Sequence, residues 1–218
     1  MSRRIAIQRS VMAADERIAE RIREDFLKRG VLMLNLIGSP GSGKTALLEG
    51  TLKDPVFRSV VLEGDVATSR DAERIARTGT PVVQINTRGG CHLEANLVEK
   101  ALGDLEMDGV DVVFVENVGN LVCPAEFDLG EDHKVALCSV PEGPDKPLKY
   151  PHLFMKAQAV LLTKVDLLEH MDFDRDLFWN DVKALNPRAE RLEVSALRGD
   201  GLSEWISAVE RWIRAKRS

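Results

Sequence analysis

Short apolar runs alternate with amphipathic stretches along most of the chain. Runs typical of buried strands occupy residues 31–37, 59–63, 81–85, 111–115, 134–140, 159–164 and 191–195. The residues between and around them predict helices over 13–29, 46–52, 69–77, 91–105, 174–185 and 201–214. Because strands alternate with helices, we expect an α/β fold with a mostly parallel sheet and helices on both of its faces.

Two stretches stand apart from this alternation. Ile18, Ile22 and Phe26 recur at four-residue spacing before Gly30, which predicts an amphipathic helix ended by a glycine. That helix either packs on the sheet or serves as an arm for a partner or a second copy of the chain. Residues 141–152 hold four prolines, so we expect an ordered loop there rather than regular structure.

Composition narrows the class of protein. The 218 residues suit one α/β domain, and 44% of them are hydrophobic and 30% charged. The net charge of −5 gives no electrostatic reason to expect nucleic acid or an anionic membrane as a partner. No apolar run approaches the roughly 20 residues that span a bilayer, and residues 1–6 lack the apolar core of a signal peptide. We therefore expect a cytoplasmic protein whose three cysteines are free thiols or metal ligands.

Residues 38–45 read Gly-Ser-Pro-Gly-Ser-Gly-Lys-Thr and match the phosphate-binding loop pattern G-x-x-x-x-G-K-[ST]. A predicted strand precedes this loop and a predicted helix follows it, so backbone N–H groups and the positive end of a helix dipole converge at one place. Lys44 supplies a positive charge for the β- and γ-phosphates, and the Thr45 hydroxyl suits Mg²⁺. The sequence therefore predicts a P-loop domain over 31–218, with residues 1–30 as a helical arm packed on it.

Thr163-Lys164-Val165-Asp166 follows the sixth predicted strand and bears on the choice of base. The Asp166 carboxylate can accept hydrogen bonds from the ring N–H and the amine of guanine, whereas adenine would leave it unpaired. Thr163 stands where Asn is usual in this element, so it keeps a hydroxyl but loses an amide. Together these features favour GTP and GDP over adenine nucleotides. The residues expected to bind the nucleotide are Gly41, Ser42, Gly43, Lys44, Thr45, Ala46, Lys164, Asp166, Ser195 and Ala196.

Two carboxylates follow predicted strands at the edge where the phosphate loop lies. Asp65 and Glu116, together with Thr45, are the expected oxygen ligands of Mg²⁺, directly or through water. Residues 116–119, Glu-Asn-Val-Gly, stand where GTPases usually have D-x-x-G, with a glycine amide placed to sense the γ-phosphate. No Gln occupies the usual water-orienting position, so we expect slow hydrolysis. Lys44, Asp65 and Glu116 are the expected catalytic residues.

A second centre is predicted from Cys91, His92 and Cys123. In a right-handed βαβ unit, a helix that begins near residue 91 starts at the carboxyl edge of the sheet, and the next strand returns to that edge at Glu116. The three side chains are therefore expected to lie together and near the nucleotide. Thiolates plus imidazole suit Zn²⁺ or Ni²⁺, and their softness alone does not choose between these ions. The alternative is inert core thiols, which is the interpretation we give to Cys138.

The segments singled out above form one series. It comprises the phosphate loop, Glu63-Gly64-Asp65 with Thr68 and Asp71-Ala72, Gly90-Cys91-His92-Leu93, Glu-Asn-Val-Gly-Asn-Leu-Val-Cys-Pro over 116–124, and Asp-Lys-Pro-Leu-Lys-Tyr over 145–150. This series resembles the HypB family, GTPases that assist nickel insertion during maturation of nickel–iron hydrogenase. The resemblance covers nearly the whole chain and implies a P-loop NTPase fold of the SIMIBI type.

The resemblance also implies partners. A homodimer would form on GTP binding, with an intersubunit Ni²⁺ or Zn²⁺ site from Cys91, His92 and Cys123. A HypA-like nickel chaperone and the hydrogenase large-subunit precursor would be the other partners. Lys146 or Lys149 would reach a nucleotide, or else both lysines are solvated. Three alternatives stay open: a nickel-delivering GTPase for urease, a metal-free regulatory GTP-binding module, and an ATP-dependent kinase in which Asp166 is idle.

Overall fold

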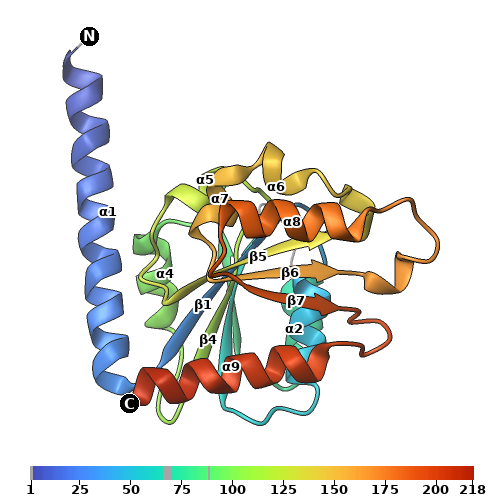
Figure 1. Ribbon diagram of the computed structural model, residues 1–218. Helices are drawn as coiled ribbons and strands as arrows, with labels where there is room; N and C mark the ends of the chain where they lie inside the picture. The colour runs from blue at the N-terminus through green and yellow to red at the C-terminus, as the bar shows by residue number, and fades with distance from the viewer. Residues whose placement is uncertain (1, 66–69, 88) are drawn as a thin grey trace.

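A parallel sheet of seven strands forms the centre of the protein (Figure 1), in the order β3-β2-β4-β1-β5-β6-β7. This computed structural model describes residues 2–65, 70–87 and 89–218, with side chains described from residue 13 onward except at Asp65. The strands lie within two residues of their expected bounds, so the α/β expectation is confirmed. They are β1 (Leu32–Gly38), β2 (Ser59–Asp65), β3 (Val82–Asn86), β4 (Val112–Glu116), β5 (His133–Ser139), β6 (Ala159–Thr163) and β7 (Glu190–Val194).

Helices cover both faces of the sheet (Figure 1). On one face, Leu47 of α2, Ile75 of α3 and Trp205 of α9 pack against β1, β4 and β5. On the other face, α1 and α4 cover β2 and β4, while α7 and α8 cover β5 and β6. The helices are α1 (Ser2–Arg29), α2 (Lys44–Leu52), α3 (Arg70–Ala76), α4 (Ala95–Leu102), α5 (Cys123–Glu126), α6 (Lys146–Lys149), α7 (Pro151–Lys156), α8 (Arg175–Leu185) and α9 (Leu202–Arg217), with short 3₁₀ turns η1 (Val140–Glu142) and η2 (Val165–Leu167).

Strand β1 is the central element because it lies between β4 and β5 and is buried along its whole length. Leu34 and Leu36 face one core cluster and Met33 faces another, as the two-residue period of a strand requires. Asn35 is fully buried on the same strand and is its one strongly polar side chain. The carboxyl ends of β1, β2, β4 and β6 meet at one edge, which is where the candidate site lies.

The helix predicted to open at Cys91 begins later, at Ala95, and ends at Leu102. The Asp15 carboxylate of α1 explains this correction: its two oxygens accept hydrogen bonds from the backbone N–H groups of Ala95 and Asn96, each at 3.1 Å. A carboxylate that satisfies these donors caps the helix there. Cys91 and His92 therefore lie in a loop.

The expectation of a loop without regular structure over 141–152 is wrong. This stretch contains α6 and the start of α7, and η1 also reaches into it. Pro141, Pro147 and Pro151 each stand in the first turn of one of these elements. Proline is tolerated there because the first N–H groups of a helix have no intrahelical partner. Helix α5, which begins at Cys123, was not predicted at all.

Helix α1 is longer than the expected 13–29 and extends beyond the other elements at its N-terminal end (Figure 1). Its C-terminal half packs through Ala19, Ile22 and Phe26 into the cluster that covers β2 and β4. The division of the chain at residue 30 stays a prediction, and Ser69, the first residue of the helix expected over 69–77, lies outside the described residues. Within 2–65, 70–87 and 89–218, no helix combines the length and apolar character needed to cross a bilayer.

Candidate nucleotide and metal site

The phosphate loop connects the end of β1 to the start of α2. Gly41 and Gly43 have φ angles of 76° and 93°, in the left-handed region that favours glycine. Gly38 has no room for a side chain, because a Cβ atom there would lie 2.3 Å from the Ser42 hydroxyl oxygen and 2.9 Å from the Leu137 carbonyl oxygen. The glycines thus allow a tight turn that aims backbone N–H groups at one point.

Lys44 lies beneath this loop and is only 7% exposed. Its ammonium group has long contacts to the carbonyl oxygens of Gly38 at 3.5 Å and Ser39 at 3.4 Å. Burial lowers the pKa of Lys44, and the negative charge of Glu116 is the largest of the influences that oppose this shift. A buried cation with such weak partners is suited to bind an anionic phosphate.

Glu116 connects the end of β4 to the phosphate loop, because its Oε1 accepts a hydrogen bond from the Thr45 hydroxyl at 2.8 Å. Burial raises the pKa of Glu116 to about 7. Its Oε2 is buried and has no hydrogen-bond partner among the described residues. A hydroxyl and an uncommitted carboxylate oxygen fit the oxygen ligands of Mg²⁺. The side chain of Asp65, the third expected ligand, lies outside the described residues; its backbone ends β2.

The segment after Glu116 lies directly against the phosphate loop. A Cβ atom on Gly119 would lie 2.8 Å from Cγ and 2.9 Å from the backbone nitrogen of Pro40. Only glycine permits this approach. A ligand that moves Pro40 would therefore also move Gly119, which is four residues before Cys123.

Of the residues expected around the base, Lys164, Asp166 and Ala196 line a pocket of about 280 Å³ together with Ala46 and Leu197. The Ser195 hydroxyl donates to the Asp166 carboxylate at 2.5 Å and thereby orients it. Lys164 is the one non-glycine residue in the described part of the chain with a positive φ, 57°. Thr163 donates through its hydroxyl to the Ser42 carbonyl at 2.6 Å, so this departure from Asn still links the base-binding strand to the phosphate loop.

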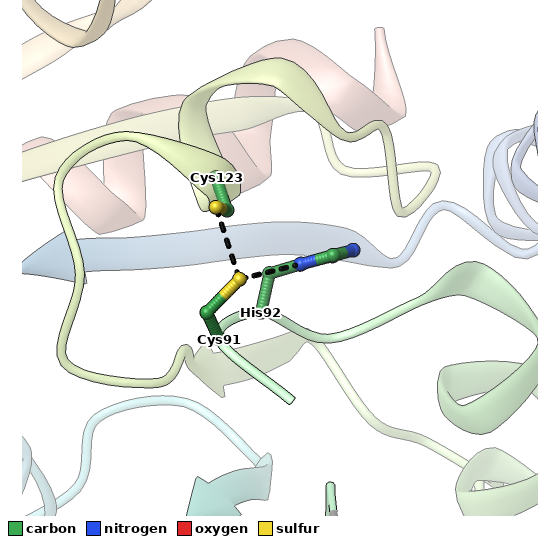
Figure 2. Close-up of side chains that lie close together, drawn as sticks. All are labelled: Cys91, His92 and Cys123. Atoms are coloured by element: carbon green, nitrogen blue, oxygen red, sulfur yellow. Dashed lines mark hydrogen bonds between the residues drawn. The ribbon is translucent and has the colours of Figure 1, made fainter. Parts of the chain in front are cut away.

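Cys91, His92 and Cys123 come together at the same edge of the sheet (Figure 2), with their ligand atoms within 4.8 Å of one another. The two sulfur atoms are 3.0 Å apart, and His92 Nδ1 lies 3.4 Å from the Cys91 sulfur. The hydrogen bond with Cys123 raises the pKa of Cys91, and burial lowers the pKa of His92. A neutral imidazole beside two thiols offers the nitrogen and sulfur donors that Zn²⁺ and Ni²⁺ accept.

Comparison with known proteins agrees with this geometry. The profile described as "CobW/HypB/UreG, nucleotide-binding domain" matches residues 32–193. Hydrogenase maturation factor HypB of Escherichia coli (strain K12) is 48% identical over 218 residues, which cover 99% of this chain and 73% of that protein. The chain belongs to the HypB family.

Two further HypB proteins extend the comparison. Hydrogenase/urease maturation factor HypB of Helicobacter hepaticus is 39% identical over 98% of this chain and 88% of its own length. The crystal structure of HypB from Helicobacter pylori in complex with nickel matches with a TM-score of 0.89 and 38% identity, over 93% of this chain and 96% of that one. The expected P-loop NTPase fold of the SIMIBI type is thereby confirmed.

Several residues around the candidate metal site were not singled out from the sequence. The Phe127 ring stacks on the His92 ring, with centroids 3.7 Å apart. Asn120 donates to the Cys91 carbonyl oxygen at 3.1 Å, and Asn117 accepts from the Leu93 N–H at 3.2 Å. The two asparagines lie in the 116–124 segment, which was the only sequence signal that could have indicated them.

Lys146 and Lys149 have partners within their own chain. Lys146 lies 3.6 Å from the Glu142 carboxylate and 5.1 Å from the centroid of the Tyr150 ring. Lys149 pairs with the Asp145 carboxylate at 2.5 Å. Lys146 is mostly buried and Lys149 is exposed, so only the second resembles the solvated lysine that was the alternative interpretation.

Proposed function

We propose that this HypB-family protein is a cytoplasmic, GTP-hydrolysing metallochaperone that couples GTP-dependent dimerisation to nickel delivery for nickel–iron hydrogenase. One observation carries the proposal: residues 116–123 join both sites. At one end, Glu116 accepts a hydrogen bond from Thr45 of the phosphate loop. At the other end, the Cys123 sulfur lies 3.0 Å from that of Cys91.

In the proposed nucleotide site, the backbone of 41–46 and the Lys44 ammonium hold the phosphates of GTP or GDP. Thr45, Glu116 and Asp65 hold Mg²⁺, which would neutralise charge on the phosphates. Asp166 recognises guanine, and Lys164, Ser195 and Ala196 complete the base pocket. Hydrolysis is slow because no Gln orients the attacking water.

In the proposed metal site, Cys91, His92 and Cys123 bind Ni²⁺ or Zn²⁺ as cargo. The nickel-bound HypB structure from Helicobacter pylori supports nickel as the ion delivered. Three donors leave a coordination position open for water, for a partner subunit or for a group on the protein that accepts the ion. Cys91 is exposed, which favours transfer of an ion to another protein.

In the proposed switch, GTP holds Gly119 and Asp65 in one arrangement and stabilises the dimer. Hydrolysis releases that arrangement and changes the geometry at Cys123. A HypA-like nickel chaperone and the hydrogenase large-subunit precursor are the proposed partners. Lys146 or Lys149 would contact the nucleotide after its ion pair, with Glu142 or Asp145 respectively, has broken.

Titration of the purified protein with Ni²⁺ tests the metal half of this proposal. We expect thiolate-to-nickel charge-transfer absorption in the wild type and its loss in Cys123→Ala. Competition for the nucleotide site between GDP and ADP tests the nucleotide half, and we expect GDP to win. No charge-transfer band would favour a metal-free regulatory module, and equal competition would favour an adenine-nucleotide enzyme.

Urease is a second candidate client, because the Helicobacter hepaticus relative is a hydrogenase/urease maturation factor. Deletion of the gene in its native host separates the two clients. Loss of hydrogenase activity with urease retained supports the first proposal, and loss of urease activity supports the second. Restoration of activity by added nickel would show that metal delivery is the step lost.

A further inference from the structure

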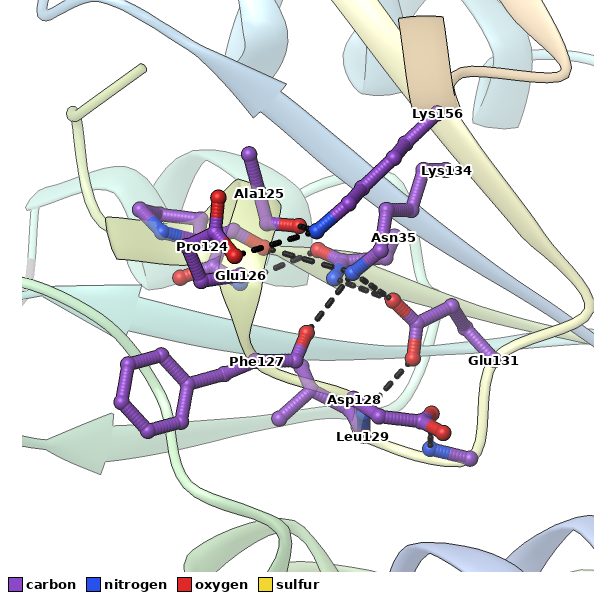
Figure 3. A network of polar contacts seen from close by, with 12 residues as sticks. Asn35, Pro124, Ala125, Glu126, Phe127, Asp128, Leu129, Glu131, Lys134 and Lys156 are labelled. Atoms are coloured by element: carbon purple, nitrogen blue, oxygen red, sulfur yellow. Dashed lines mark hydrogen bonds and ion pairs between the residues drawn. The ribbon is translucent and has the colours of Figure 1, made fainter. Parts of the chain in front are cut away.

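A continuous chain of buried hydrogen bonds runs beneath the metal centre and joins the two segments that carry its ligands. It begins at the backbone of Leu93, next to His92, and ends at the backbone of Pro124, within α5, and of Phe127, just after α5. The side chains between these ends are Asn117, Asn35, Glu131 and Lys134. Figure 3 shows the last three of these. None of Asn35, Glu131 and Lys134 belongs to the nucleotide or metal motifs.

The first half of this chain fixes the Cys91–His92 loop. Asn117 Oδ1 accepts from the N–H groups of Leu93 at 3.2 Å and Val118 at 3.0 Å. Asn117 Nδ2 donates to Asn35 Oδ1 at 3.1 Å, and Asn35 Nδ2 donates to Glu131 Oε1 at 3.1 Å. Asn35 and Asn117 are buried, and Asn35 sits on the central strand β1. The loop is therefore tied to the buried central strand of the sheet.

The second half fixes the Cys123 segment. The Lys134 ammonium donates to the Phe127 carbonyl at 2.7 Å and to the Pro124 carbonyl at 3.3 Å. It also pairs with Glu131 Oε1 at 2.5 Å. The Lys134 and Glu131 side chains are only 13% and 3% exposed. The four-residue helix α5 has unpaired carbonyls at its C-terminal end, and a cation there satisfies them.

The chain of hydrogen bonds has a fixed direction. The Leu93 N–H is a donor, so the Asn117 side chain must present its oxygen to it. The Asn117 NH₂ group then donates to the Asn35 oxygen, and the Asn35 NH₂ group donates to Glu131. At the other end, Glu131 accepts with both oxygens, since Oε2 takes the Leu129 N–H at 2.6 Å. Replacing this carboxylate by an amide would place its NH₂ group either against the Leu129 N–H or against the donors of Asn35 and Lys134. In the second case, reversing Asn35 and Asn117 would move the conflict to Leu93 and would leave Lys134 facing a donor.

We propose that Asn35, Glu131 and Lys134 are positioning residues that hold the Cys91–His92 loop and the Cys123 helix at coordinating distance. This inference rests on the proposed binding of a metal ion by Cys91, His92 and Cys123. The hydrogen bonds keep the three donors close before an ion arrives, so binding does not have to order two loops. Residues that orient metal ligands in this way typically account for about 10–100-fold in affinity.

Glu131→Gln tests the inference because it changes the polarity of the hydrogen bonds at nearly constant volume. We expect its Ni²⁺ dissociation constant, measured by competition with a chromophoric chelator, to rise about 10–100-fold. The thiolate-to-nickel absorption should shift in position or intensity. GDP affinity should stay within about twofold, which shows that the fold and the phosphate loop are intact. Lys134→Met is the second variant, and it should weaken Ni²⁺ binding in the same way.

Asp132→Asn is the matched control, since it makes an acid-to-amide change at the next residue. Asp132 pairs with Lys216 at 2.6 Å and accepts from the Met33 N–H at 2.9 Å, outside the chain of hydrogen bonds to the ligand segments. We expect wild-type Ni²⁺ affinity from it. Wild-type affinity in Glu131→Gln or Lys134→Met would overturn the inference. Loss of GDP binding together with Ni²⁺ binding in both variants would also overturn it, because these residues would then support the fold as a whole.

Cys123→Ala, measured beside these variants, separates failure of this inference from failure of the proposed function. If Cys123→Ala loses Ni²⁺ affinity while Glu131→Gln and Lys134→Met keep it, only the positioning role is wrong. If Cys123→Ala itself keeps wild-type affinity, the proposed metal site is wrong.

Discussion

The phosphate loop and the proposed metal centre lie at the same edge of one sheet but are built in different ways. The phosphate loop is a contiguous segment whose shape depends on glycines such as Gly41 and Gly43, which have positive φ angles. The metal centre is assembled from Cys91, His92 and Cys123 on two separate segments. The first site is therefore encoded locally, whereas the second depends on the scaffold that brings its segments together.

The two sites also differ in access to solvent. Lys44 is buried, as suits a site that encloses a phosphate, whereas Cys91 is exposed. An exposed ligand on a loop is suited to exchange an ion with a partner. The physical link between these sites is the 116–123 segment, in which Gly119 contacts Pro40 of the phosphate loop.

Lys44→Ala should weaken nucleotide binding strongly while leaving Ni²⁺ binding almost unchanged, which is the largest difference that we expect between the two sites. Removing a buried cation beneath the phosphates should weaken GDP binding by at least about 100-fold, because hydrogen bonds to charged groups contribute about 1.5–3 kcal/mol each. Ni²⁺ affinity without nucleotide should stay within about twofold of wild type. Fluorescent-nucleotide titration and chelator competition measure the two affinities. If the GDP affinity and the Ni²⁺ affinity fell together, the structure of the metal site would depend on that of the phosphate loop.

Glu116→Gln should remove a pH dependence of the unfolding free energy that originates at Glu116, the first residue of the segment that links the two sites. Burial raises the pKa of Glu116 from 4.5 to about 7 in the folded chain. Its protonated form therefore stabilises the fold below pH 4.5, and this contribution is lost as the pH rises to about 7. For the nucleotide-free, metal-free protein, the loss is on the order of 3 kcal/mol.

Denaturant unfolding of wild type and Glu116→Gln at a series of pH values measures that difference. We expect the unfolding free energy of wild type to fall relative to that of the variant between pH 4.5 and about 7. Parallel pH profiles would contradict the assignment of this titration to Glu116.

Asp166→Asn should change which base the nucleotide site accepts without affecting the metal centre. An amide cannot accept both guanine N–H groups, so GDP affinity should fall by about 10–100-fold. Xanthosine diphosphate presents a carbonyl in place of the guanine amine and can accept a hydrogen bond from the Asn amide, so it should bind the variant more tightly than the wild type. Competition between the two nucleotides gives the ratio of their affinities. An unchanged preference for GDP would show that Asp166 does not contact the base.

Asp15→Ala should have the smallest effect and tests how the metal loop depends on α1. The Asp15 carboxylate caps α4 just after the Cys91–His92 loop. Loss of a helix cap costs about 1 kcal/mol, so the thermal midpoint should fall by a few degrees. Amide hydrogen exchange should rise at Ala95 and Asn96 and not in the phosphate loop. Unchanged hydrogen exchange at Ala95 would show that Asp15 does not determine where α4 begins.

The difference between the two sites also explains which features could be predicted from the sequence. Buried parallel strands read as apolar runs, so each strand was predicted to within two residues of its bounds, and the phosphate loop was identified from eight consecutive positions. The start of α4 was missed because Asp15, which caps it, lies far away in sequence. Asn35, Glu131 and Lys134 were missed for the same reason, since nothing in their neighbouring residues shows that they meet beneath the metal centre.

The most direct test of a link between the sites is the Ni²⁺ dissociation constant of one preparation with Mg²⁺–GDP and with a non-hydrolysable GTP analogue. Coupling between two sites is typically 1–3 kcal/mol, so we expect the two values to differ by at least about fivefold. Because coupling is reciprocal, Ni²⁺ should change the ratio of analogue to GDP affinity by the same factor. Dissociation constants that agree within about twofold would show that the nucleotide does not control the metal centre.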